Sequence, residues 1–191
     1  MRRPALLILV LTMMPALCCR AQSEPRRVSF GVEWGYSPVF YYNYKYVYRD
    51  DYGTTVLDKG QDVCFDSNAF ILARVGLRLG EKSEVSLLSG YCGIATGRKA
   101  VPLLLRYNYA SGGSGRDGLL VFADGGVGLW AGESPPVLCN LGAGRRVVLD
   151  DKLHLDFTAG LRASLDHPLG DSGLRNDRFS AGIVLGVELG F

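Results

Sequence analysis

Five polar residues that could support acid–base or nucleophilic chemistry lie at even positions of one segment: His154, Asp156, Thr158, Arg162 and Ser164. In a β-strand, residues two positions apart share a face, so the Asp156 carboxylate could orient the His154 imidazole as a general base. The same residues also suit the interior of a narrow barrel, which polar side chains and ion pairs fill. We favour this second interpretation and predict no catalytic residue and no enzymatic activity.

Two other segments contain residues that are typical of ligand sites. Residues 111–115 are rich in glycine, but they lack the Lys-Ser/Thr pair of a phosphate-binding loop and do not open a helix. Asp50 and Asp51 lack the spaced oxygen ligands and the distal Glu of a calcium loop. We therefore predict no cofactor site and no metal site.

The segment that carries His154 and Asp156 alternates between apolar and polar or small residues. Over residues 153–164 the alternation has no exception, and residues 178–191 repeat it with one apolar intruder, Val184. Twelve alternating residues are long for an ordinary strand and suit a tilted strand that crosses a bilayer. Six further segments fit less cleanly, which gives eight predicted strands: residues 28–36, 71–79, 85–91, 101–109, 119–130, 137–147, 153–164 and 178–191.

These segments predict an all-β protein, an eight-stranded antiparallel up-and-down transmembrane β-barrel. Short turns at residues 80–83 and 150–152 alternate with long connections at residues 37–67 and 166–177. An even number of strands brings both termini to the same side, and the long connections are then expected at the cell surface. The connection at residues 111–118 is longer than this scheme expects on the periplasmic side, and the connection at residues 96–100 is short for an external loop.

A soluble barrel also alternates, but with its apolar face inward. Here the polar face is rich in glycine, it carries charges of both signs, and the apolar face of the last strand continues to Phe191. We therefore expect the apolar face to contact lipid and the polar face to line the lumen. Six charged residues are predicted to form inward ion pairs: Arg74, Arg106, Arg162, Asp124, Asp156 and Glu188.

Residues 1–21 are predicted to be a cleaved signal peptide, followed by a barrel domain over residues 22–191. Arg2 and Arg3 precede about 13 mostly apolar residues, too few for a membrane-spanning helix. Leu17 before Cys18 does not match a lipobox. Without Arg2, Arg3 and Arg20, the 21 Lys and Arg residues fall to 18 against 19 acidic residues, a formal charge of −1. That balance gives no reason to expect a nucleic-acid partner.

Three cysteines remain after the predicted cleavage: Cys64, Cys92 and Cys139. Their spacing matches neither a disulfide framework nor a metal site. One disulfide could form in an oxidising compartment, but the sequence does not select the pair. We favour three small, unpaired fillers.

Residues 40–48 contain five tyrosines. One interpretation is that they prolong the first strand above the membrane, with rings in an external aromatic girdle alongside Trp34 and Tyr36. The other is a recognition surface for a sugar, a peptide or a partner protein. We favour the girdle.

Two strands and the C-terminus resemble those of PorT-like outer-membrane β-barrel proteins. Residues 101–107 look like the Pro-Leu-Leu-aromatic strand of that family, and residues 122–130 look like the glycine-rich strand that follows it. The terminal Phe191 resembles the signal that the barrel assembly machinery reads. The resemblance implies the barrel fold and the outer membrane, and it implies no single activity.

The leading hypothesis is a non-enzymatic outer-membrane protein with a structural or interaction role through its external loops. The alternatives are a membrane-embedded enzyme that acts on lipid or peptide, and a narrow pore. The expected partners are outer-membrane lipid, the barrel assembly machinery, and an extracellular ligand or protein at the tyrosine-rich first loop.

Overall fold

The structure is a computed structural model that describes residues 27–95, 98–113, 115–129, 135–150, 153–167 and 176–191. The predicted signal peptide at residues 1–21 lies outside these ranges, as does most of the connection at residues 166–177. Within them, no helix is long and apolar enough to cross a membrane.

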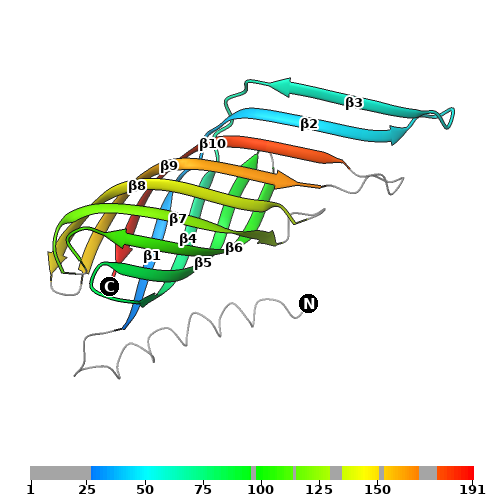
Figure 1. The fold of residues 1–191 in the computed structure, drawn as a ribbon. Coiled ribbons are helices and arrows are strands. Elements are labelled where there is room, and N and C mark those ends of the chain that lie inside the picture. The colour runs from blue at the N-terminus through cyan, green and yellow to red at the C-terminus, as the bar shows by residue number, and fades with distance from the viewer. Residues whose placement is uncertain (1–26, 96–97, 114, 130–134, 151–152, 168–175) are drawn as a thin grey trace, which may run out of the picture.

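Ten antiparallel strands form one sheet (Figure 1). They are β1 (Val28–Tyr36), β2 (Val39–Arg49), β3 (Thr55–Asp62), β4 (Ala69–Arg78), β5 (Ser83–Ala95), β6 (Arg98–Ala110), β7 (Gly118–Leu129), β8 (Val137–Asp150), β9 (Leu153–Asp166) and β10 (Asp177–Gly190). The order is β1-β4-β5-β6-β7-β8-β9-β10, and β1 pairs back onto β10. The predicted eight-stranded up-and-down barrel is therefore confirmed, because this pairing closes the sheet.

The other two strands, β2 and β3, form a hairpin that extends one end of the barrel wall (Figure 1). β10 pairs with β1 over its C-terminal half and with β2 over its N-terminal half. The prediction of a loop at residues 37–67 was wrong for most of that segment. A break at Ser37 and Pro38 lets the chain continue as β2, and the Pro38 carbonyl accepts a hydrogen bond from Ile183 N at 3.0 Å.

The alternation in the sequence places apolar side chains on the outside of the barrel. Leu161 and Leu141, at the middle of β9 and β8, are 63% and 62% exposed, whereas Arg74 and Asp156 on the opposite face are 0% and 1% exposed. This distribution is the reverse of that in a soluble barrel. The predicted orientation of the two faces is confirmed.

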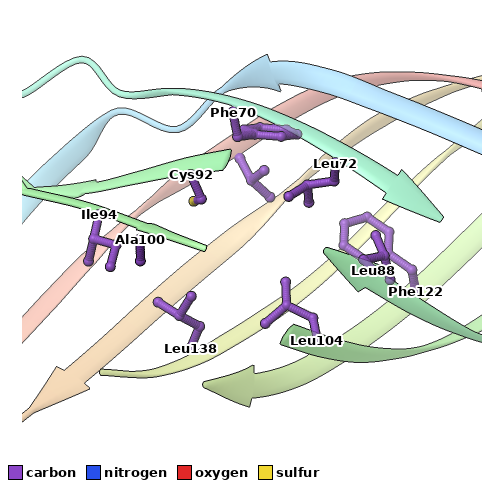
Figure 2. Packing of buried hydrophobic residues seen from close by; sticks show 10 residues of the cluster. Phe70, Leu72, Leu88, Cys92, Ile94, Ala100, Leu104, Phe122 and Leu138 are labelled. Carbon is purple, nitrogen blue, oxygen red and sulfur yellow. The ribbon is translucent and has the colours of Figure 1, made fainter. Parts of the chain in front are cut away.

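An apolar cluster lies in the interior of the barrel (Figure 2). It contains Phe70, Leu72, Leu88, Cys92, Ile94, Ala100, Leu104, Phe122, Leu138 and Val184. These residues come from six of the eight barrel strands, β4, β5, β6, β7, β8 and β10. The cluster therefore fills part of the lumen with buried apolar side chains.

The C-terminus completes the closure of the barrel. Phe191 N donates to Phe30 O at 2.9 Å, and Phe30 N donates to Phe191 O at 2.8 Å. The two rings stack with their centroids 6.2 Å apart. Phe191 therefore pairs with the first strand at the closing seam.

Candidate functional site

The charged residues of the lumen surround three arginines. The first is Arg74, on β4, which forms an ion pair with Glu84 and places its Nε 2.6 Å from Glu188 Oε1. Ser29 Oγ donates to the other Glu84 oxygen at 2.7 Å. Because Arg74 is fully buried, these carboxylates replace the water that the guanidinium loses.

The second arginine, Arg106 on β6, joins three strands. Its Nη1 lies 2.7 Å from Glu33 Oε2 and 3.8 Å from Glu188 Oε2, and its Nη2 lies 2.8 Å from Asp124 Oδ2. The guanidinium also lies over the Phe122 ring at 4.7 Å. The inward ion pairs predicted for Arg74, Arg106, Asp124 and Glu188 are thus confirmed.

The third arginine, Arg146 on β8, binds Asp156, the carboxylate that could orient His154 as a general base. Its Nε and Nη2 donate to the two oxygens of Asp156 at 2.8 and 2.6 Å. His154 Nε2 lies 3.8 Å from Asp156 Oδ2. Ser164, on the same face, bonds with Ser180 at 2.6 Å instead. The structure therefore gives Asp156 a bidentate arginine as its main partner and does not join His154 to Ser164.

His154, Asp156 and Glu188 could each offer a metal-ligand atom, and these atoms lie within 4.8 Å of one another. However, Arg146 binds Asp156 and Arg74 binds Glu188. Two guanidinium groups at the carboxylates oppose the approach of a cation, so we assign no metal to this cluster.

Arg162 departs from the prediction. It donates to Asn140 Oδ1 at 2.7 Å and to Cys92 Sγ at 3.0 Å, and its guanidinium lies over the Phe70 ring at 5.4 Å. The expectation of a carboxylate partner was wrong for this residue. It lies at the level of the apolar cluster, above the carboxylates that bind Arg74 and Arg106.

A stack of tyrosines lies at the mouth, on β2. The Tyr42 and Tyr44 ring centroids are 5.9 Å apart, those of Tyr44 and Tyr46 are 5.0 Å apart, and the Tyr42 and Tyr46 hydroxyls share a hydrogen bond of 3.1 Å. Tyr44 packs over Gly60 of β3, where a Cβ would lie only 2.7 Å from the Tyr44 hydroxyl.

This stack, Tyr42, Tyr44 and Tyr46, continues the lumen side of the wall. Tyr42 pairs with Ser180 and Tyr44 pairs with Arg178, both on the inward face of β10. The prediction that the tyrosines prolong the first strand is confirmed, whereas the girdle interpretation is wrong for these three rings. Trp34 and Tyr36, by contrast, are exposed on the outward face.

The stack borders a mouth cavity of about 290 Å³. Its lining is Val39, Tyr42, Asp62, Cys64, Asp66, Arg98 and Arg178. Asp166 forms an ion pair with Arg98 and lies 3.3 Å from Arg178 Nε, which fixes both guanidinium groups at the cavity floor. Burial and the hydrogen bond with Tyr42 raise the pKa of Tyr46 well above its usual value. The cavity therefore offers the Tyr42 phenol beside charges of both signs.

The three described cysteines are free thiols. Cys64 lines the mouth cavity, Cys92 is buried in the lumen, and Cys139 is exposed on the outward face of β8. No pair of these positions forms a disulfide in the described residues, and only Cys92 fills interior space.

The strand pairing and the two faces of the wall define the class of protein as a closed β-barrel with an apolar exterior. No family model matches the chain, and no curated protein matches it. The PorT-like resemblance accordingly stays a prediction.

One solved structure that the chain resembles is the solid-state NMR structure of outer membrane protein AlkL in DMPC lipid bilayers. The identity is 14% and the TM-score is 0.41, over 90% of this chain and 94% of that one. A likeness at this level carries no argument for the present chain, so the fold rests on the strand pairing.

Proposed function

We propose that this chain is an outer-membrane protein that does not conduct and has no enzymatic activity, and that it binds an extracellular ligand or partner protein at its mouth. The observation that carries the proposal is that the tyrosine-bearing hairpin β2–β3 extends beyond a barrel whose interior is filled.

The exposed apolar belt supports the location in a membrane. Every barrel strand exposes large apolar side chains on its outer face, far more than the few hundred Å² that a soluble monomer usually exposes in one patch. Contact with lipid removes the free-energy cost of exposing these apolar side chains to water. Closure of the barrel satisfies the backbone polar groups that would otherwise face hydrocarbon. Export across the inner membrane would depend on the predicted signal at residues 1–21.

The filled lumen supports a role without conduction. The arginine network and the apolar cluster adjoin each other, with Arg106 over the Phe122 ring, and both consist of buried side chains. An ion would have to break the buried ion pairs and then cross an apolar layer, both of which are costly.

The hairpin supports recognition at the mouth. Tyrosine provides a large contact area at low entropic cost, and the fixed guanidinium groups of Arg98 and Arg178 add polar contacts. The arrangement suits a partner with both apolar and hydrogen-bonding groups.

Planar-bilayer recordings test the absence of conduction. We expect no current steps from the wild type. A variant with Leu88→Gly and Leu104→Gly removes two side chains of the apolar cluster and should open a measurable leak, which shows that the protein has inserted. Steps from the wild type like those of the variant would overturn the proposal.

Thiol labelling of intact cells tests the surface position of the hairpin. In a background without Cys64, Cys92 and Cys139, Asp51→Cys at the hairpin turn should react with an impermeant maleimide. Lys82→Cys, in the turn at the opposite end, should react only after the outer membrane is opened. The reverse pattern would overturn the proposed orientation.

A further inference from the structure

Arg145 is a charged residue within the apolar outer face. It is exposed on β8, between Ala143 and Val147 on the same face, and its cross-strand partners are the outward-facing Leu119 and Phe157. The other described outward-facing charges on the barrel strands, Lys99, Asp150 and Asp177, lie in the first or last two residues of their strands.

No described acidic side chain pairs with Arg145. This inference rests on the proposed membrane location, where a lone arginine facing lipid is unfavourable unless it reaches an anionic group. Leu119, its partner on β7, is the second residue of that strand, counted from the end of the barrel where β1 begins and β10 ends. The charge therefore lies toward the level of one row of lipid headgroups, and a long side chain can extend to it.

An apolar groove of about 660 Å³ lies beside Arg145. Ala143, Gly144 and Phe157 line its near edge, and Trp34, Tyr36 and Leu185 line it further along the wall. Arg145 follows Gly144 in the chain and pairs with Phe157. One ligand can therefore contact the charge and the groove together.

Two small residues on the outer face make the groove. Ala143 and Ala159 are direct cross-strand partners on the outward faces of β8 and β9. Both line the groove, and their methyl side chains leave the wall hollowed beside the larger outward-facing side chains of Phe157 and Leu185.

We propose that Arg145 and this groove form a binding site for an anionic phospholipid. The Arg145 guanidinium binds the phosphate, and one acyl chain lies in the groove over Ala143 and Ala159 and against Phe157. A guanidinium matches phosphate oxygens with two parallel hydrogen bonds, which supplies the counter-charge that the described protein residues do not. The site faces the leaflet at the end of the barrel where β1 begins and β10 ends.

Native mass spectrometry of the detergent-solubilised protein, with added phosphatidylglycerol or phosphatidylcholine, tests the proposal. The wild type should retain one phosphatidylglycerol in preference to phosphatidylcholine. Arg145→Gln should weaken that binding about tenfold, as expected for the loss of a charge-assisted hydrogen bond. Ala159→Phe should also weaken it, by filling the groove while leaving Arg145 in place.

Lys99→Gln is the matched control, because it removes one outward cation at the other rim and should leave the binding unchanged. A wild type without preference, or an Arg145→Gln variant that keeps the preference, overturns the proposal. The proposal is also overturned if the protein forms a dimer without lipid and Arg145→Gln dissociates that dimer, because Arg145 would then serve a contact between protein chains. A heat-modifiable mobility of each variant shows separately that the barrel is intact, so failure of this site is distinguishable from failure of the membrane barrel.

Discussion

Arg106 on β6 reaches across the interior to Glu33 on β1, with 2.7 Å between Nη1 and Oε2. Glu33 and Glu188 are direct cross-strand partners at the seam where β1 closes against β10. Two carboxylates facing each other there would repel, and Arg106 lies close enough to attract both. The same side chain therefore supports the closure of the barrel and fills its lumen.

Arg106→Ala should destabilise the barrel by about 3–5 kcal/mol, because it leaves buried carboxylates without their counter-charge. Adding Glu33→Gln should recover part of that loss, since one of the orphaned charges is removed. Urea unfolding in lipid vesicles measures both effects, with Lys99→Ala on the same strand as the control. An unchanged midpoint for Arg106→Ala would mean that the network faces bulk water.

Arginine on the outer face of β9 should destabilise the barrel according to its depth. Leu161→Arg, at the middle of the strand, should cost about 2–4 kcal/mol, and Leu153→Arg, at its end, about 0–1 kcal/mol. The two positions lie on the same face, so they differ mainly in depth. The same unfolding assay measures both, and equal effects would contradict a lipid-facing belt.

Deletion of Phe191 should impair assembly in the outer membrane. It removes the two backbone hydrogen bonds with Phe30 as well as the stacked ring, and leaves polar groups of β1 unpaired at the closing seam. Phe191→Ala keeps the backbone and should be the milder change. The amount of protein in the outer-membrane fraction is the measurement, and normal assembly of the deletion variant would refute the role of this contact.

The tyrosine stack should make the mouth sensitive to high pH. Burial and the hydrogen bond with Tyr42 raise the pKa of Tyr46, so the folded hairpin keeps this phenol protonated where an unfolded chain ionises it. Its stabilising contribution is complete below the ordinary tyrosine pKa of about 10 and is lost as pH rises through the higher folded value. Ultraviolet titration should show a late-titrating phenol that Tyr46→Phe removes; an unchanged titration curve would contradict the assignment.

The barrel strands were predictable because each has a face whose apolar side chains recur with a period of two. The hairpin was not, because residues 40–48 put aromatic or polar side chains on both faces of β2 and give no apolar face to recognise. The pairing with β10 also shifts by one residue between Val39, which pairs with Gly182, and Tyr41, which pairs with Ala181, so the alternation of β1 cannot be continued through β2.

The lumen network was predictable in its location and only partly in its pairs. Alternation shows which residues face inward, but the stagger between strands decides which of them share a level. Glu33 and Arg146 were inward-facing in the sequence pattern, yet their roles as partners of Arg106 and Asp156 depend on that stagger. For the same reason Arg162 meets Asn140 and Cys92 instead of a carboxylate.

The central claim is that the chain forms a closed β-barrel in a membrane. The most direct test is electrophoresis of the purified, detergent-solubilised protein with and without boiling. A closed membrane barrel resists dodecyl sulfate at room temperature and migrates as a compact species, and boiling converts it to the mobility of the unfolded chain. We expect this shift for the wild type. A single mobility under both conditions, from protein that is also soluble without detergent, would contradict the membrane barrel.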